Sequence, residues 1–411
     1  MKVLVISAAF PPMKAGEADH TYQICRHLGQ AGLEVHVLTT RGSQVAQQAP
    51  FVTHAEMRSW SWFDLPRLVQ WIRRINPDVV LLVYIGWIYQ DHPMMTFAPT
   101  VIRAVRPHCR VVTQFEYPMG ANNDKYSRVT RMIRKLVERW ASPLDSDYVM
   151  GTLLRDSHGV IVLSDRHRRM LAAHYAPVDK KAVLIPPPPL LTMASPPTPD
   201  ERGLLRAKLG FGEEHIVFVY FGYIYPPKGV ETLLRAFHIM GKHHPRTRLL
   251  VVGGVVAHEY PERPRFAAEM RALPMELGFQ HQVVWAGDFE TESDQASQYI
   301  YASDICVFPH DLGVYLNNSS FAAVAAHGLP IVATRPEEVE NAFQDGENLL
   351  FCDPKSPEAM ASAMSRIVRE DELRNRLRRG ATKLAGEWFS WDRATSRMLD
   401  VLMTAKAPGA A

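Results

Sequence analysis

Short apolar runs alternate along the chain with segments in which apolar residues recur every third or fourth position. In the first half of the sequence the apolar runs cover residues 2–6, 34–39, 78–83, 110–113 and 159–163. Between them, Leu65, Leu68, Ile72 and Ile75 have the spacing of one face of a helix. Apolar strands separated by amphipathic helices are typical of a parallel sheet that is covered on both faces.

The same pattern restarts in the second half, where the apolar runs cover residues 216–221, 248–252, 283–286, 305–309 and 330–333. A proline-dense stretch, 186–199, lies between the halves and favours an extended linker over a helix. We therefore predict an α/β protein with two doubly wound, Rossmann-like domains, 1–190 and 200–388. Such domains bind ligands at the carboxyl ends of their strands, so we expect a central cleft lined by both sheets.

Composition and charge exclude several classes of protein. Lys and Arg number 46 against 43 Asp and Glu, and this balance argues against a dedicated nucleic-acid binder. The four cysteines form no CxxC pair, so free thiols in a reducing cytosol are expected. No apolar stretch is long enough to span a membrane, and the first residues read as a buried strand rather than a signal peptide. We therefore predict a cytoplasmic protein.

The first candidate site follows the first predicted strand. The loop 10–20 contains Gly16 and leads into a helix expected to begin near Asp19. A glycine at a strand-to-helix connection lets the backbone approach a ligand, and a helix N-terminus favours anions. His20 would lie on the first turn and face the cleft, although core packing or a capping role would also account for it. A plain connection remains the alternative for the whole loop.

The second candidate site occupies the same position in the second domain. Gly222 and Tyr223 follow an apolar strand, and Lys228 and Gly229 precede a helix. A lysine at this place can meet a diphosphate as a point charge. A solvated surface lysine is the alternative.

The third candidate site is a polar stretch, Asn317, Asn318, Ser319 and Ser320, ahead of a small, apolar helix. These residue types cap helices without any ligand. They also offer amide and hydroxyl groups to a phosphate or a sugar, and both roles can hold at once.

These stretches together resemble a known family. The loop 11–20, the segments 228–237, 302–309 and 326–332, and the segment 345–351 are similar to those of GT-B glycosyltransferases, and specifically resemble the retaining family 4. The resemblance implies that the second domain binds a nucleotide-diphosphate sugar and that the first binds the acceptor. It also implies transfer with retention and without a metal, and a C-terminal helix, 389–411, that crosses back to the first domain.

The sequence departs from the family pattern at several positions. Aligning on the turn at 328–330 puts Tyr315 and Ala323 where the family carries a pair of glutamates. The expected phosphate-binding arginine aligns with Tyr223, and the expected histidine of the first domain aligns with Phe115, beside Glu116. These changes remove two carboxylates and one cation from the implied donor site.

From the residues and the resemblance together, the candidate catalytic residues are His20, Glu116 and Asp311. The candidate donor-binding and phosphate-binding residues are Gly16, Gly222, Tyr223, Lys228, Asn317, Asn318, Ser319, Ser320 and Glu338, with Glu340 as an alternative to Glu338. No metal site and no cofactor are predicted, and a nucleotide-diphosphate sugar is the expected co-substrate.

The leading hypothesis is a glycosyltransferase with a glycan, a lipid-linked molecule or a small molecule as its acceptor. The missing glutamates keep open a non-catalytic protein that binds a nucleotide, a glycan or a partner enzyme. A third reading is another reaction of sugar nucleotides on the same fold. The segment 128–140 has an apolar face flanked by arginines, so it could lie on the inner face of a membrane or pack on the core. Asp145 and Asp147 form an Asp-x-Asp pair that reads as a helix-end turn.

Overall fold

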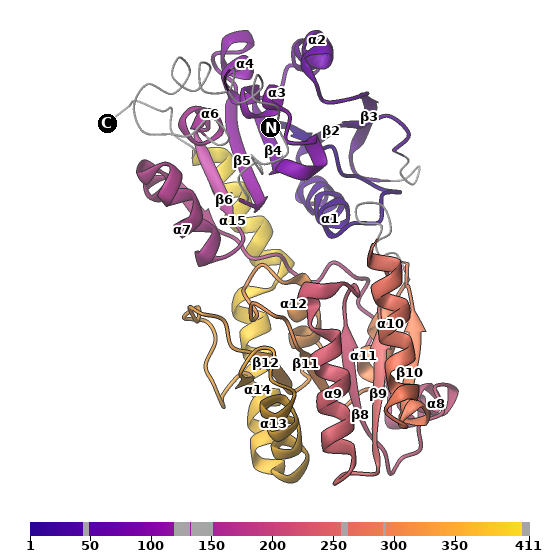
Figure 1. Ribbon diagram of the computed structural model, residues 1–411. Helices are drawn as coiled ribbons and strands as arrows, with labels where there is room; N and C mark the ends of the chain where they lie inside the picture. The colour runs from indigo at the N-terminus through magenta and orange to yellow at the C-terminus, as the bar shows by residue number, and fades with distance from the viewer. Residues whose placement is uncertain (44–48, 119–131, 133–150, 256–261, 291–292, 405–411) are drawn as a thin grey trace. The chain divides into compact units, whose positions relative to one another are not determined.

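The computed structural model describes residues 1–43, 49–118, 132, 151–255, 262–290 and 293–404. The chain forms two compact units (Figure 1). Unit 1 comprises Met1–Pro186 and the chain from Trp391 onward, and unit 2 comprises Pro187–Ser390. The boundaries between the two units fall after residues 186 and 390. From the sequence, we placed the domain boundaries at residues 190, 200 and 388.

Unit 1 is built on a seven-stranded parallel sheet with the order β3-β2-β1-β4-β5-β6-β7. Its strands are β1 (Lys2–Ile6), β2 (Glu34–Thr40), β3 (Val52–Met57), β4 (Val79–Ile85), β5 (Arg110–Tyr117), β6 (Gly159–Val162) and β7 (Ala182–Leu184). Its helices are α1 (Gly16–Gln30), α2 (Leu65–Ile75), α3 (Pro93–Thr96), α4 (Ala98–Val105), α6 (Gly151–Asp156), α7 (Asp165–His174) and α15 (Trp391–Thr404). Helix α1 begins at Gly16 rather than near Asp19.

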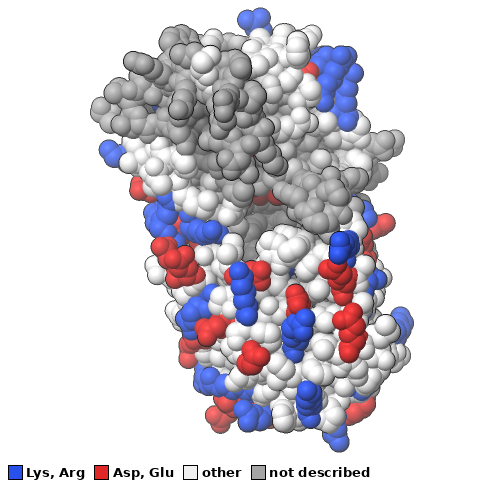
Figure 2. Space-filling model, viewed as in Figure 1, with Lys and Arg blue, Asp and Glu red and all other residues white. Residues whose placement is uncertain are grey.

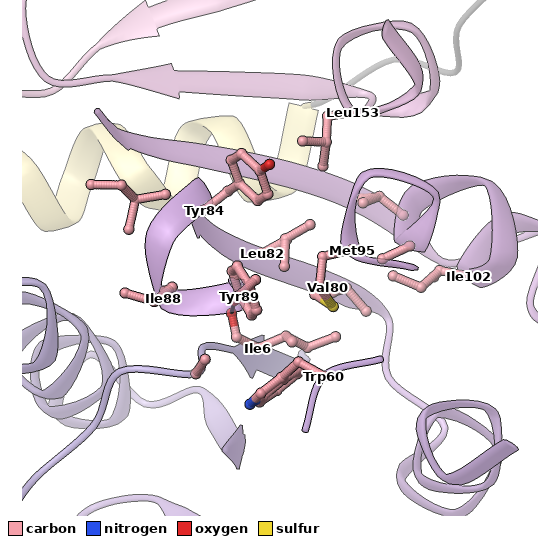
Figure 3. Packing of buried hydrophobic residues seen from close by; sticks show 14 of the residues in the cluster. Ile6, Trp60, Val80, Leu82, Tyr84, Ile88, Tyr89, Met95, Ile102 and Leu153 are labelled. Atoms are coloured by element: carbon pink, nitrogen blue, oxygen red, sulfur yellow. Dashed lines mark hydrogen bonds between the residues drawn. The ribbon is translucent and has the colours of Figure 1, made fainter. Parts of the chain in front are cut away.

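Both faces of this sheet are buried, as the near-continuous apolar runs predict. In β1, Leu4 and Ile6 pack into one core cluster while Val3 and Val5 pack into another on the opposite face, because successive side chains of a strand alternate. Figure 3 shows the first cluster, where Trp60 and Tyr89 lie against the strands β1 and β4. The two clusters hold the carboxyl ends of the strands in fixed positions.

Helix α15 contributes to the core of unit 1 although it lies at the far end of the sequence. Its residues Ala394, Met398 and Leu402 belong to the same cluster as Val3 and Val5 of β1. They repeat at intervals of four residues, which places them on one face of the helix.

Unit 2 is built on a six-stranded parallel sheet with the order β10-β9-β8-β11-β12-β13. Its strands are β8 (Ile216–Phe221), β9 (Thr247–Val252), β10 (Val283–Gly287), β11 (Ile305–Phe308), β12 (Ile331–Thr334) and β13 (Leu350–Cys352). Its helices are α8 (Pro199–Lys208), α9 (Val230–Gly241), α10 (Glu262–Glu276), α11 (Gln295–Tyr301), α12 (Ser319–Ala326), α13 (Pro357–Arg369) and α14 (Asp371–Trp388). The predicted α/β class with two doubly wound parallel sheets is therefore confirmed.

Three strands were not predicted from the sequence, and all three lie at an edge of a sheet. Strand β3 is only partly buried for most of its length, and its polar residues hide the strand pattern. Strands β7 and β13 contain three residues each, too few to give a recognisable apolar run. An edge strand has one neighbour, so it needs less apolar surface than a central strand.

Charged side chains of both signs are interspersed over the part of unit 2 seen in Figure 2. The described residues of that face form no large patch of charge of one sign. This agrees with the near balance of acidic and basic residues in the sequence.

One buried histidine of unit 2 links stability to pH. Burial lowers the pKa of His327 from 6.5 to about 4, although the hydrogen bond to the Ala323 carbonyl opposes the shift. The Nδ1–H of His327 donates to that carbonyl at 2.7 Å, which leaves Nε2 to accept from the Ser297 hydroxyl at 2.6 Å. Protonating Nε2 turns it from an acceptor into a donor, so the Ser297 hydroxyl could no longer donate to it.

We expect unit 2 to lose stability as the pH falls below about 6.5, where the unfolded histidine binds a proton and the folded one does not. The loss should reach about 2 kcal/mol at pH 5 relative to pH 7 and level off below pH 4. Urea unfolding of the wild type and of His327→Gln at both pH values measures it. An equal pH dependence in the two proteins would contradict this assignment.

Candidate functional site

The order of the strands reverses once in each sheet, and most predicted site residues lie at these reversals. In unit 2 the reversal lies between β8 and β11, and in unit 1 it lies between β1 and β4. Connections leaving two adjacent strands at such a point run in opposite directions and open a crevice at the carboxyl end of the sheet. In unit 2 the two connections are 222–229, after β8, and 309–318, after β11.

Glycines allow these connections to pack closely. Gly222 has a φ of 144°, and a Cβ there would lie 3.5 Å from the Ser320 hydroxyl. Gly229 has a φ of 66°, and a Cβ there would lie 1.9 Å from the Pro309 carbonyl oxygen. The predicted residues Gly222 and Ser320 are thus brought together, as are Gly229 and the loop that carries Asp311.

The Lys228 ammonium is a cation at this crevice. It lies 5.6 Å from the centre of the Tyr225 ring, and no carboxylate pairs with it in the described part of the chain. Lys228 also lies near His310, whose pKa is well below 6.5 because of burial and, secondarily, the charge of Lys228. His310 is therefore neutral, and the positive charge of Lys228 is available to an anion.

Two backbone amides of the β8 connection already have hydrogen-bond acceptors. The amide of Gly229 donates to the Pro226 carbonyl at 3.0 Å, and the amide of Gly222 donates to Val252. These two amides therefore already have acceptors within unit 2. Tyr223 is half-buried, and its carbonyl accepts a hydrogen bond from the Tyr220 hydroxyl at 2.7 Å.

Helix α12 presents its N-terminus at the same crevice. Asn318 caps it, because its side-chain oxygen accepts from the Phe321 amide at 3.1 Å. Within the described chain the amides of Ser319 and Ser320 meet no acceptor. Free amides at a helix N-terminus favour an anion. Asn317 is half-buried just ahead of the cap.

The connection after β11 is fixed by two buried polar groups: Glu340, which the sequence offered as an alternative donor contact, and Thr334, which sequence reasoning missed. The Glu340 carboxylate is buried and accepts from the Leu316 amide at 2.5 Å. The Thr334 hydroxyl donates to the His310 carbonyl at 2.6 Å. Glu340 therefore acts as an anchor of this loop, while Glu338 is exposed on the segment after β12. No pattern near Thr334 in the sequence indicates such a role.

Asp311 lies beside the β8 connection, with Oδ1 3.2 Å from the position of a Cβ on Gly229. Burial raises the pKa of its carboxyl, and the charge of Lys355 opposes the shift. Its amide donates to the Pro227 carbonyl at 3.0 Å, so the two connections are tied together.

In unit 1 the predicted residues His20 and Glu116 form a buried pair. His20 Nδ1 lies 2.9 Å from one carboxylate oxygen of Glu116 and 3.0 Å from the other. The two residues are 4% and 9% exposed, so this pair lies almost out of solvent. The Gln114 amide donates to the Glu116 carboxylate at 2.6 Å. Gln114 is a third member that sequence reasoning missed.

Gly16 is the first residue of α1, and a Cβ there would meet no atom within 4 Å. The glycine is therefore not imposed by packing. Trp391, the first residue of α15, stacks on His27 with ring centres 4.2 Å apart and lies 6.4 Å from the His20 ring. The C-terminal segment thus reaches the helix that carries His20.

The departures from the family pattern are visible in the fold of unit 2. Ala323 is 1% exposed inside α12, and Tyr315 is half-buried in the connection after β11. Neither position supplies a carboxylate. This crevice therefore has a cation and helix amides but lacks an acidic pair at these two positions.

Some predictions fall where the structure gives no description. Of segment 128–140 only residue 132 is described, and Asp145 and Asp147 lie outside the described residues. Over the described chain, no helix combines the length and the apolar character that crossing a bilayer requires. No group of three or more His, Cys, Asp or Glu side chains that could hold a metal ion occurs among the same residues.

Two family models match the two halves of the chain. The model described as "Glycosyltransferase Family 4" matches residues 15–188, and the model described as "Glycosyl transferases group 1" matches residues 215–370. The matched regions correspond to unit 1 and unit 2, and they include the connections that carry His20 and Lys228.

Curated relatives are named D-inositol 3-phosphate glycosyltransferase. The protein of Nocardioides sp. is 31% identical over 219 residues, which cover 51% of this chain and 46% of the relative. The protein of Nocardiopsis dassonvillei is 28% identical over 262 residues, which cover 63% and 58%. The chain thus spans about half the length of the curated relatives that it matches.

Solved structures resemble the whole chain in fold. A glycosyltransferase from Rickettsia africae has a TM-score of 0.74 at 14% identity, and the match covers 98% of both chains. Anabaena HepE in complex with UDP and glucose has a TM-score of 0.72 at 14% identity, and the match covers 98% of this chain and 99% of HepE. Each half of the chain therefore matches a glycosyltransferase family model, the chain has the fold of the GT-B glycosyltransferases, and its first half resembles family 4.

Proposed function

We propose that the protein transfers a sugar from a nucleotide-diphosphate sugar to an acceptor, without a metal ion. The acceptor belongs to one of three classes: a glycan, a lipid-linked molecule or a small molecule. Retention of configuration is what the resemblance to family 4 alone implies. Unit 2 binds the donor and unit 1 binds the acceptor.

One observation carries this proposal. At the strand reversal of unit 2, the Lys228 ammonium has no carboxylate partner in the described chain, and the α12 amides of Ser319 and Ser320 meet no acceptor. Their positive charge and N–H groups suit a diphosphate. Stabilising the departing diphosphate in this way lowers the barrier to breaking its bond to the sugar.

The relatives support the same chemistry. The curated relatives act, by name, on an inositol phosphate, and HepE is solved with UDP and with UDP-glucose. A uridine nucleotide is therefore the first donor to test.

The test is calorimetric titration of the protein with UDP, GDP and ADP and with their common sugars. We expect one nucleotide to bind and Lys228→Ala to weaken its binding about 10- to 150-fold. A charge-assisted hydrogen bond of this kind is worth about 1.5–3 kcal/mol. Lys242→Ala, which removes an exposed lysine after α9, is the control and should bind as the wild type does. Equal affinity in Lys228→Ala would refute the assignment of this crevice.

A second candidate function is a non-catalytic protein that binds a nucleotide, a glycan or a partner enzyme. The observation that favours it is the buried Ala323, together with Tyr315, at the positions of the family's glutamates. Nucleotide binding without release or transfer of the sugar would support it. Transfer to any acceptor would exclude it.

A further inference from the structure

His310 is a buried histidine of the unit 2 crevice. It follows β11 directly and is 9% exposed. Its carbonyl accepts from the Thr334 hydroxyl at 2.6 Å, and the next amide, that of Asp311, donates to the Pro227 carbonyl at 3.0 Å. The backbone that carries the ring is therefore held from two sides, close enough to Lys228 for its charge to act on the imidazole.

Asn318 determines which nitrogen of this ring carries the proton. Its Oδ1 accepts from the Phe321 amide at 3.1 Å, so its NH₂ group is the one that faces His310 Nδ1, at 3.4 Å. An amide NH₂ group only donates, and Nδ1 must therefore accept and carry no proton. Burial and, secondarily, the charge of Lys228 hold the pKa of His310 well below 6.5, so the ring is neutral at pH 7. The single ring proton is consequently on Nε2.

The Nε2–H of His310 lacks an acceptor. It meets no hydrogen-bond partner among the residues that the structure describes, and it is not one of the unpartnered polar atoms sealed from solvent, so it reaches solvent. A donor on a largely buried side chain costs free energy unless a ligand or water accepts from it. The amides of Ser319 and Ser320 and the Lys228 ammonium need an acceptor at the same crevice. Together these groups suit an anion with several oxygens.

From this geometry we infer that His310 donates its Nε2–H to the diphosphate of the nucleotide, beside Lys228. This inference rests on the proposed function. The chain has Tyr223 where the family pattern has a phosphate-binding arginine, so the β8 connection lacks one expected donor. His310 supplies a donor from the connection after β11 instead. Because the imidazole is neutral, it adds an N–H group without placing a second positive charge next to Lys228 before the nucleotide binds.

The first test is calorimetric titration with whichever of UDP, GDP and ADP binds the wild type. We expect His310→Leu, which keeps an apolar body but has no N–H, to raise the Kd about 10- to 100-fold, as loss of a hydrogen bond to a charged group does. His310→Gln keeps an amide N–H near the place of Nε2 and should stay within about threefold of the wild type. His281→Leu replaces an exposed histidine of unit 2 and is the control. Wild-type affinity in His310→Leu would overturn the inference.

The second test uses the wild-type protein and so does not depend on how a variant folds. In ¹⁵N-labelled protein, with His310→Gln used to assign the signal, His310 should show a proton on Nε2 and a bare Nδ1 before nucleotide is added. Saturating nucleotide should move the Nε2–H proton signal downfield and slow its exchange with water, because the proton enters a hydrogen bond to a charged oxygen. A histidine with a purely structural role would show neither change. A proton on Nδ1, or an unmoved Nε2–H signal, would overturn the inference.

The third test uses inorganic pyrophosphate, which carries the diphosphate alone. We expect His310→Leu and Lys228→Ala each to weaken its binding by about the factor by which they weaken binding of the nucleotide. Weaker nucleotide binding in His310→Leu with unchanged pyrophosphate binding would assign His310 to another part of the nucleotide and overturn the inference. Failure of the nucleotides and of pyrophosphate to bind the wild type counts against the proposed function. An effect of Lys228→Ala without one of His310→Leu counts against this inference only, so the two failures are distinguishable.

Discussion

Replacing Asp304 with alanine is expected to destabilise unit 2 by about 3–5 kcal/mol. Its carboxylate accepts hydrogen bonds from Arg202 at 2.7 Å, from Arg206 at 3.1 Å and from the Val217 amide at 2.8 Å. The Arg206 side chain is 5% exposed. Removing one partner of a buried ion pair leaves the other charge buried and uncompensated, and this accounts for the size of the effect.

The position of Asp304 explains why its replacement should lower the stability of unit 2. The residue immediately precedes β11, and its own amide donates to the Val217 carbonyl in β8. It therefore joins α8 to the two strands between which the sheet reverses its order. The two arginines lie on α8, directly after the proline-rich stretch.

Differential scanning calorimetry measures this prediction. The transition of unit 2 should fall by about 6–20 °C, given about 2–4 °C per kcal/mol for a domain of this size. Glu269→Ala removes the exposed ion pair between Arg265 and Glu269 and is the control, with an expected cost below about 1 kcal/mol. Comparable losses in the two variants would show that the Asp304 cluster contributes no more than a surface pair.

Replacing Gly229 with alanine is expected to abolish donor binding while the charge of Lys228 remains. The added Cβ would lie 1.9 Å from the Pro309 carbonyl oxygen, and this neighbour is backbone, which cannot rotate away as a side chain does. The left-handed φ of 66° adds about 1–2 kcal/mol for a residue with a side chain. The connections after β8 and β11 must therefore move apart.

The variant Gly210→Ala distinguishes the effect of backbone strain from the effect of a steric clash in this experiment. Gly210 has a φ of 76°, but a Cβ there would meet no atom within 4 Å. We expect Gly210→Ala to lose about 1–2 kcal/mol of stability and to bind the nucleotide normally. Gly229→Ala should lose nucleotide binding by calorimetry. Wild-type affinity in Gly229→Ala would mean that the shape of this crevice does not matter for binding.

Much of the candidate site could be predicted from the sequence, because its residues come directly after the carboxyl ends of strands. The order of apolar runs and turns locates the connections that carry Gly222, Lys228 and Ser320, and parallel strands bring such connections to one edge of the sheet. The prediction could not distinguish Glu338 from Glu340. Glu340 is buried against the Leu316 amide, and that contact depends on how the loop folds back after β12.

The sequence by itself determined the α/β class, the two doubly wound sheets and the proline-rich junction, because these follow from local periodicity and from the backbone limits of proline. The tertiary structure alone decided the edge strands β3, β7 and β13, which carry too little apolar sequence to be recognised. It also decided the pairing of His20 with Glu116 and Gln114. These residues come from separate elements, and only the packing of α1 against the sheet of unit 1 brings the imidazole within hydrogen-bonding distance of the carboxylate.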